Sequence, residues 1–221
     1  MTDKTMTADP ATDFTVHRAR GPFNAVFFSL MGPFIEWNLK RHKRRVFSEL
    51  PETVVEIGSG VGANLAYLSP GSTLVAVEPN YPMHRRLRAK AERHGVRLDL
   101  RDRPAERTDL PDQSVDSVIS SLVLCTVSDP AEVLAEIRRI LRPGGTFRFV
   151  EHVAAQPGTP TRALQRALRR PWAWTFEGCS CERDLAGVVR AAGFARVDIE
   201  PFRLHTPFIT FNTQIAGVAH S

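Results

Sequence analysis

The feature that most constrains this chain is a strand-like segment that runs directly into three glycines. Residues 53–57 are mostly β-branched, as is typical of a buried strand, and Gly58, Gly60 and Gly62 follow at alternate positions. Glycine allows a sharp turn and a close approach of the backbone to a ligand. Residues 63–68 are compatible with a helix, whose first N–H groups favour negative charge. The segment therefore predicts a loop that binds a nucleotide-like cofactor.

An acidic residue after the next predicted strand narrows the choice of cofactor. Residues 73–77 are expected to form that strand, and Glu78 follows it, where a carboxylate can accept hydrogen bonds from both hydroxyls of a ribose. The glycine spacing alone does not identify the cofactor. Gly58, Gly60 and Ala63 also fit the G-x-G-x-x-A pattern of dinucleotide-binding proteins.

The rest of the chain alternates strand and helix patterns, which predicts an α/β fold. The expected strands are residues 53–57, 73–77, 96–100, 115–120 and 146–150. The expected helices are residues 63–68, 82–94, 130–141 and 182–192. This order implies βαβ units and a parallel sheet. Residues 196–202 and 213–219 are expected to close the domain as an antiparallel pair at one edge.

Two further features resemble one large family. Glu56 precedes the glycines and gives E-x-G-x-G-x-G, and residues 141–145 read L-R-P-G-G before a strand. Together they resemble the class I S-adenosylmethionine (SAM) dependent methyltransferases with a methyltransferase type 11 domain. The resemblance implies a Rossmann-like sheet of seven mostly parallel strands with an antiparallel edge pair, flanked by helices. It also implies SAM as cofactor and an enzyme that methylates a small molecule.

Ligands of open α/β sheets bind at the carboxyl ends of the strands, so the residues after each strand are site candidates. In the resemblance, the loop after the third strand contacts the adenine, although Glu106 fits a plain charged loop equally well. Residues 120–125 and 151–152 are expected to face the methyl acceptor. The predicted cofactor-binding residues are Glu56, Gly58, Ser59, Gly60, Gly62, Asn64, Glu78, Pro79, Ala105, Glu106, Ser121 and Leu122.

A narrower resemblance rests on a set of short motifs and extends from about Lys43 to the C-terminus. These motifs are G-A-N at 62–64, E-P-N at 78–80, L-V-L-C at 122–125, E-H-V at 151–153, and G-C at 178–179 followed by R-D at 183–184. They resemble the thiol S-methyltransferase family of methyltransferase-like proteins. The resemblance implies that the acceptor atom is the sulfur of a small apolar thiol. The alternative is O-, N- or C-methylation of a quinone precursor, a lipid headgroup or another small metabolite.

Methyl transfer from SAM requires few catalytic side chains, because the sulfonium is a good leaving group and proximity supplies much of the acceleration. A free thiol is only a few per cent thiolate at neutral pH, so a base could raise the reactive fraction. His152 is the candidate base; its other possible role is to position its own loop through a hydrogen bond. Cys125 is expected to be a small apolar filler. Cys179 and Cys181 are expected to line a wall near the acceptor.

The N-terminal region is expected to be an appendage to the catalytic domain. We predict a disordered tail at residues 1–20, a helical segment at 21–50 and the methyltransferase domain at 51–221. Two interpretations of the helical segment compete. One is a lid of two short helices over the SAM site, with its basic stretch at residues 40–45 as a solvated face. The other is an interfacial anchor that makes weak peripheral contact with anionic lipid.

Composition limits the setting and the partners. The length of 221 residues with 43% hydrophobic content suits one domain. The net charge of +5 reflects high Arg usage, and residues 120–123 lack the Asp- or Asn-Pro-Pro-aromatic motif of nucleic-acid amino methyltransferases, so no nucleic-acid partner is expected. The cysteine spacing favours neither a disulfide framework nor a zinc site, and no metal is predicted. We therefore expect a cytoplasmic monomer; a SAM-fold protein that binds without turnover is the non-enzymatic alternative.

Overall fold

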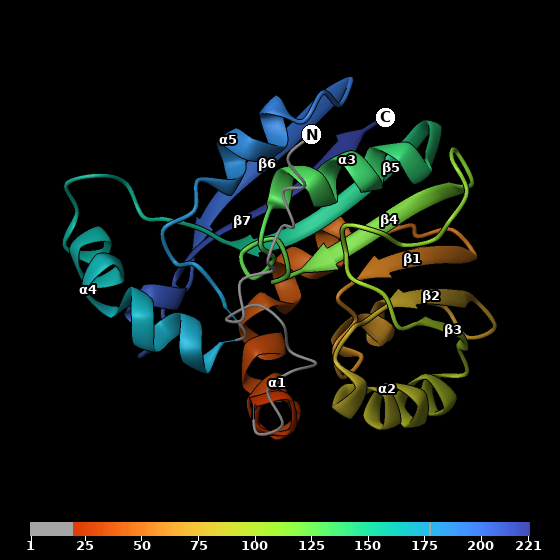
Figure 1. Cartoon of the computed structure of the whole chain (residues 1–221), viewed down its shortest axis with the longest axis horizontal. Helices are drawn as coiled ribbons and strands as arrows, with labels where there is room; N and C mark the ends of the chain where they lie inside the picture. Colours follow the sequence, from red (N-terminus) through yellow and green to blue (C-terminus); the bar gives the residue numbers. More distant parts are fainter. Residues whose placement is uncertain (1–19, 177) are drawn as a thin grey trace, which may run out of the picture.

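Seven strands form one sheet in the computed structural model, which describes residues 20–176 and 178–221 (Figure 1). The strands are β1 (Thr53–Ile57), β2 (Thr73–Val77), β3 (Arg97–Arg101), β4 (Val115–Ser121), β5 (Leu141–His152), β6 (Arg196–Arg203) and β7 (Thr213–His220). Their order across the sheet is β3-β2-β1-β4-β5-β7-β6. The first five strands pair in parallel, and β7 is antiparallel to both β5 and β6. The predicted mostly parallel sheet with an antiparallel edge pair is confirmed.

Helices cover both faces of this sheet. They are α1 (Arg20–Val46), α2 (Tyr81–His94), α3 (Pro130–Ile140), α4 (Pro160–Thr175) and α5 (Leu185–Ala191), with the 3-10 helices η1 (Ala63–Tyr67) and η2 (Ile209–Phe211). Figure 1 shows α1 and α2 on one face and α3 and α5 on the other. Each face has its own apolar core, which buries Leu39 and Leu87 on the first side and Leu134 and Val189 on the second. The sheet is therefore a shared middle layer.

The helix before β5 shows how local sequence sets the boundaries. Asp129 caps α3 by accepting a hydrogen bond from the Ala131 N–H at 2.8 Å, and proline follows at the first helical position. The L-R-P-G-G segment was expected to be a turn before a strand at residues 146–150, but it belongs to β5. A Cβ at Gly145 would lie 3.2 Å from the Asp116 carbonyl oxygen, so glycine lets the chain approach β4 closely there.

The helices differ from the sequence-based expectation in three places. The segment after the glycines is a 3-10 helix of five residues, not an α-helix of six. Helix α4 was not predicted. The two short helices expected near the N-terminus are one continuous helix, α1, with Pro33 inside it. Proline removes one backbone hydrogen bond, but α1 still buries Ala25, Leu39 and Val46, and this packing stabilises the helix on both sides of it.

The basic stretch at the end of α1 is not solvated throughout. Lys43 is only 1% exposed, forms an ion pair with Glu36 one heptad earlier, and donates a hydrogen bond to Asn64 Oδ1 at 2.9 Å. Asn64 in turn donates to Glu56 Oε1 at 2.6 Å. By contrast, Arg45 forms an exposed ion pair with Glu200. The expectation of a solvated face is therefore wrong for Lys43, because it faces the glycine loop.

We predict that Lys43→Met destabilises the protein by about 2–4 kcal/mol, because it leaves the Glu36 carboxylate without its partner in a mostly buried site. Arg45→Met is the matched control and should cost less than about 1 kcal/mol, since solvent screens its ion pair. Urea unfolding of both variants without cofactor measures the difference. Equal effects of the two substitutions would show that the buried network adds no stability.

Candidate active site

A groove lies at the carboxyl ends of β1, β2 and β4, beside α1 and α2. It is lined by the glycine loop, by Glu78, by the loop at residues 102–106 and by the end of β4. Every predicted cofactor-binding residue lines this groove except Gly62. Gly62 has a positive φ of 79°, and a Cβ there would lie 2.6 Å from Leu65 Cδ1. Its glycine is required by the turn into η1.

Glu78 connects the loop to the end of β2. Its carboxylate accepts hydrogen bonds from the Gly60 N–H at 2.6 Å and from the Asn80 N–H at 2.8 Å. Burial raises the pKa of Glu78 to about 7, and the hydrogen bonds from these two amides oppose that increase. A carboxylate held in this way at the groove wall is well placed to accept the hydroxyls of a ribose.

Two buried oxygen atoms in the groove wall are suited to a ligand. Glu56 Oε2 and Ser121 Oγ have no hydrogen-bond partner within the described part of the chain. Burial raises the pKa of Glu56 to about 7, although the hydrogen bond from Asn64 opposes this. Buried polar groups without partners are rare in native structures. They fit a ligand that carries both hydrogen-bond donors and a positive charge, as SAM does.

Leu122 has a backbone conformation that is unusual for a residue with a branched side chain. Its φ is +61°, and its N–H donates to the Val150 carbonyl at 2.9 Å. The left-handed region costs such a residue of the order of 1–2 kcal/mol. Leu122 lines the groove on one side and a second, apolar cavity on the other. The strained residue thus lies at the junction of two sites.

The apolar cavity contains mostly aromatic side chains. It shares Phe28, Ile35, Leu122 and Thr126 with the groove, so the two spaces adjoin. Its walls come from α1, from the end of α4 and from η2, and none of the described residues that line it is Lys, Arg, Asp or Glu. The lining residues are Phe27, Phe28, Met31, Phe34, Ile35, Leu122, Cys125, Thr126, His152, Trp172, Phe176, Cys179, Phe208 and Phe211.

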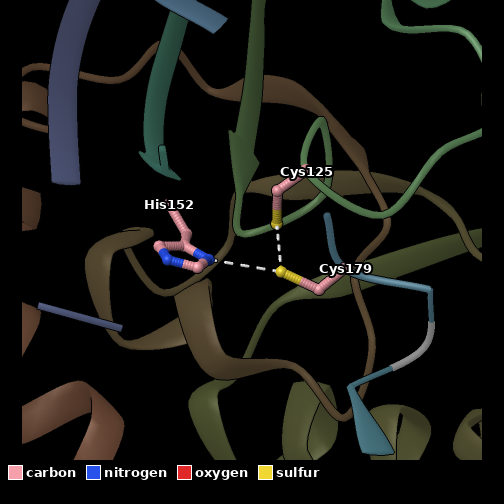
Figure 2. A group of neighbouring side chains, drawn as sticks. All are labelled: Cys125, His152 and Cys179. Carbon is pink, nitrogen blue, oxygen red and sulfur yellow. Dashed lines mark hydrogen bonds between the residues drawn. The ribbon is translucent and has the colours of Figure 1, made fainter. Parts of the chain in front are cut away.

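Cys125, His152 and Cys179 form a cluster in the cavity wall (Figure 2). His152 Nδ1 lies 3.3 Å from Cys179 Sγ, and the two sulfurs are also 3.3 Å apart. Burial lowers the pKa of His152, but the Cys179 sulfur, the Thr210 carbonyl and Glu151 together raise it overall. The hydrogen bond with Cys125 and the nearby imidazole lower the pKa of Cys179. Cys181, which was also expected near the acceptor, instead lies against the Gln165 carbonyl, 3.2 Å away.

Glu151 holds the loop that carries Leu122 and Cys125. It is fully buried, and it accepts hydrogen bonds from Ser120 Oγ at 2.9 Å and from the Val123 N–H at 3.2 Å. From the sequence, Glu151 was part of the E-H-V motif and was expected to face the acceptor with His152, but of the two only His152 lines the cavity. Neither this role nor that of Lys43 was foreseen, because both depend on contacts between distant segments.

We predict that Glu78→Ala weakens SAM binding at least tenfold in isothermal titration calorimetry. A charge-assisted hydrogen bond contributes about 1.5–3 kcal/mol, and losing one without compensation corresponds to about a tenfold change in affinity. Glu132→Ala is the control, since Glu132 is a carboxylate at the rim of the same groove. Unchanged affinity in folded Glu78→Ala would contradict the assignment of Glu78 to the ribose.

Because the pKa of Glu78 is raised, the affinity for SAM should also depend on pH. Because Glu78 is protonated in the cofactor-free protein below about pH 7 and must lose that proton to accept two hydroxyls, SAM affinity should fall about tenfold from pH 8 to pH 6. Glu78→Gln reports the contribution of all other groups, including Glu56 and SAM itself. A wild-type profile that parallels the Gln variant would show that Glu78 does not titrate on binding.

Comparisons with known proteins agree with this geometry. Residues 55–149 match the family described as methyltransferase domain. A human thiol S-methyltransferase, TMT1A, is 32% identical over 188 residues, which cover 80% of this chain and 77% of that protein. The ubiquinone/menaquinone biosynthesis C-methyltransferase UbiE of Acidiphilium cryptum is 29% identical over 211 residues, 82% of this chain and 84% of that protein.

A solved structure shows the same fold. The SAM-dependent methyltransferase from Aquifex aeolicus superposes with a TM-score of 0.63 at 16% identity, covering 89% of this chain and 97% of that chain. The domain match, the human relative and the sheet order agree on the cofactor, SAM, and on the type of reaction. The chain belongs to the class I SAM-dependent methyltransferases and is an enzyme of that family.

Proposed function

We propose that the protein transfers the methyl group of SAM to the sulfur of a small, largely apolar thiol. The observation that carries this proposal is the largely apolar cavity, with no Lys, Arg, Asp or Glu among its described lining residues, that adjoins the SAM groove at Leu122 and Thr126. An apolar guest in that cavity would lie next to the cofactor, and its reacting atom would need only a short, well-aligned path to the methyl carbon. The relatives named as thiol S-methyltransferases support sulfur as the acceptor atom.

The reaction is an in-line displacement in which the acceptor sulfur donates an electron pair to the methyl carbon. The bond from that carbon to the sulfonium breaks, and its electron pair stays with the cofactor, which leaves as S-adenosylhomocysteine. The acceptor thiol must lose its proton. His152 stays the predicted base, and Nδ1 is the nitrogen that could accept that proton, because Nε2 contacts the Thr210 carbonyl at 2.6 Å.

A second candidate is C- or O-methylation of a quinone precursor. It is favoured by the similarity to UbiE over most of the chain and by the same cavity, which suits an aromatic ring as well as an alkyl thiol. The two candidates share fold, cofactor and cavity. They differ in the nucleophilic atom of the acceptor.

Pairs of acceptors that differ only in the nucleophilic atom test the proposal most directly. Purified enzyme with isotopically labelled SAM would be offered thiophenol and phenol, an alkanethiol and its alcohol, and a hydroquinone, and products would be identified by mass spectrometry. We expect methylation of the thiol in each pair and none of its oxygen analogue. Methylation of phenol or hydroquinone with the thiols untouched would contradict the assignment of sulfur.

We also propose that α1 is the lid of the site and that its outer side makes a weak peripheral membrane contact. Phe28 and Ile35 of α1 line both spaces, whereas Val26 and Leu30, one helical turn apart, are 48% and 75% exposed and line neither. An exposed apolar stretch followed along the helix by the basic residues 40–45 is suited to contact with a lipid headgroup region. No described helix combines the length and apolar character needed to cross a membrane.

The paired substitution Val26→Ser/Leu30→Ser separates the two roles of α1, because neither residue lines the groove or the cavity. It should reduce sedimentation with anionic liposomes several-fold, because each exposed side chain would lose its apolar contact with lipid. SAM affinity should stay unchanged, since the lid side of the helix is intact. Equal sedimentation of the double variant and the wild type would exclude this surface as the contact.

A further inference from the structure

The cluster in the cavity wall brings together three potential metal ligands from distant parts of the chain. Cys125 lies in the loop after β4, His152 ends β5, and Cys179 lies in the loop after α4 (Figure 2). Their ligand atoms all lie within 4.8 Å of one another, and all three side chains are buried. Two thiols and an imidazole at this spacing are ligands of the kind that bind transition metals in proteins.

The ligand types and distances suit Zn²⁺. Zinc binds thiolate sulfur at about 2.3 Å and imidazole nitrogen at about 2.0–2.1 Å, so ligand atoms of a tetrahedral site lie about 3.6–3.8 Å apart. The observed separations of 3.3 Å, sulfur to sulfur and nitrogen to sulfur, need to widen by only a few tenths of an ångström. Two thiolates and a neutral imidazole also neutralise the charge of Zn²⁺, as an apolar wall requires.

The hydrogen bond that His152 makes through Nε2 leaves Nδ1 available to bind a metal. Its Nε2 lies 2.6 Å from the Thr210 carbonyl oxygen, and because a carbonyl can only accept, the proton is on Nε2. In the neutral imidazole, which is the form that binds a metal, Nδ1 therefore presents its lone pair toward Cys179 Sγ, 3.3 Å away. A ligand histidine whose other nitrogen donates to a backbone carbonyl is the usual arrangement in metal sites.

All three residues line the cavity, so one side of the cluster is open to it. Three protein ligands with a fourth position left open are typical of catalytic zinc sites, whereas structural sites use four. The three motifs L-V-L-C, E-H-V and G-C, on which the narrower resemblance rests, each supply one member of the cluster. The spacing argument against zinc missed it, because the residues are far apart in sequence.

We propose that Cys125, His152 and Cys179 bind Zn²⁺, whose open fourth position takes the sulfur of the acceptor thiol. This inference rests on the proposed function. On binding, the thiol releases its proton to solvent, as thiols do when they coordinate zinc. The coordinated sulfur then attacks the methyl carbon, the carbon–sulfonium bond breaks, and the neutral thioether leaves the metal. Zinc keeps its oxidation state, and His152 acts as a ligand instead of a base.

Metal binding can be measured without turnover. Protein purified under reducing conditions without a metal-affinity tag should hold close to one zinc per chain by mass spectrometric elemental analysis. Metal-free protein loaded with Co²⁺ should show the absorption of thiolate-to-cobalt charge transfer, and adding thiophenol should increase it. Reduced protein that takes up no stoichiometric Zn²⁺ or Co²⁺ would overturn the inference.

Substitutions identify the ligands. Cys125→Ser, Cys179→Ser and His152→Gln should each weaken zinc binding, measured by competition with a chromophoric chelator, by more than the roughly 10–100-fold typical of losing a supporting residue. Cys181→Ser is the matched control, because Cys181 is a buried cysteine outside the cluster. Unchanged SAM affinity would show that each variant is folded. Equal zinc affinity in the wild type and the three cluster variants would contradict the assignment.

Activity separates this inference from the function on which it rests. Stoichiometric zinc at this cluster, with no thiol methylated, would support the metal site and refute the thiol acceptor. If metal-free protein methylated thiols at the full rate, the thiol acceptor would be supported and the role of zinc would be overturned. Loss of thiol methylation on chelation and its recovery with Zn²⁺ would support both.

Discussion

Three buried carboxylates at the carboxyl ends of β1, β2 and β5 hold the site in place. Glu56 in β1 is linked through Asn64 to Lys43 of α1, Glu78 after β2 binds the glycine loop, and Glu151 in β5 binds the loop after β4. Burial raises the pKa of each to about 7, so holding them ionised in this environment is unfavourable. Such groups concentrate at functional sites, where geometry matters more than stability.

The two substrate spaces have different origins in the chain. The SAM groove is built mainly from short segments that follow consecutive parallel strands, and its position follows from the topology of the sheet. The cavity instead combines α1 with the end of α4 and with η2, and α1 lies more than a hundred residues from both in sequence. Leu122, in its strained conformation, is one of the four residues that line both spaces. The groove is therefore a product of the sheet topology, and the cavity proposed for the acceptor depends on elements packed against it.

The cavity wall has a chemical character that aromatic packing alone does not explain. Most of its surface is apolar, yet it includes an imidazole and two thiols in mutual contact. A hydrophobic wall with one small cluster of soft ligands would favour an apolar molecule with a sulfur atom over an amine or an alcohol. The proposed acceptor and the proposed metal site thus account for different parts of the same wall.

The sequence alone was sufficient for the cofactor half of the protein. The strand, the glycines, Glu78 and the alternation of elements depend on backbone conformation and on the rule that parallel strands end at one edge, and both are local or topological properties. Of the residues predicted from the sequence to bind the cofactor, all but Gly62 line the groove, and the glycine at position 62 serves the turn into η1.

The acceptor half was decided by tertiary structure. The buried position of Lys43, the continuous helix through Pro33, helix α4 and the meeting of Cys125, His152 and Cys179 could not be read from local patterns. The hydrophobic effect is non-directional. An apolar segment in the sequence therefore does not specify which distant apolar segment it packs against. When α1, α4 and η2 pack near the carboxyl ends of the strands, side chains that are distant in sequence become neighbours. The chemistry of those side chains depends on these contacts.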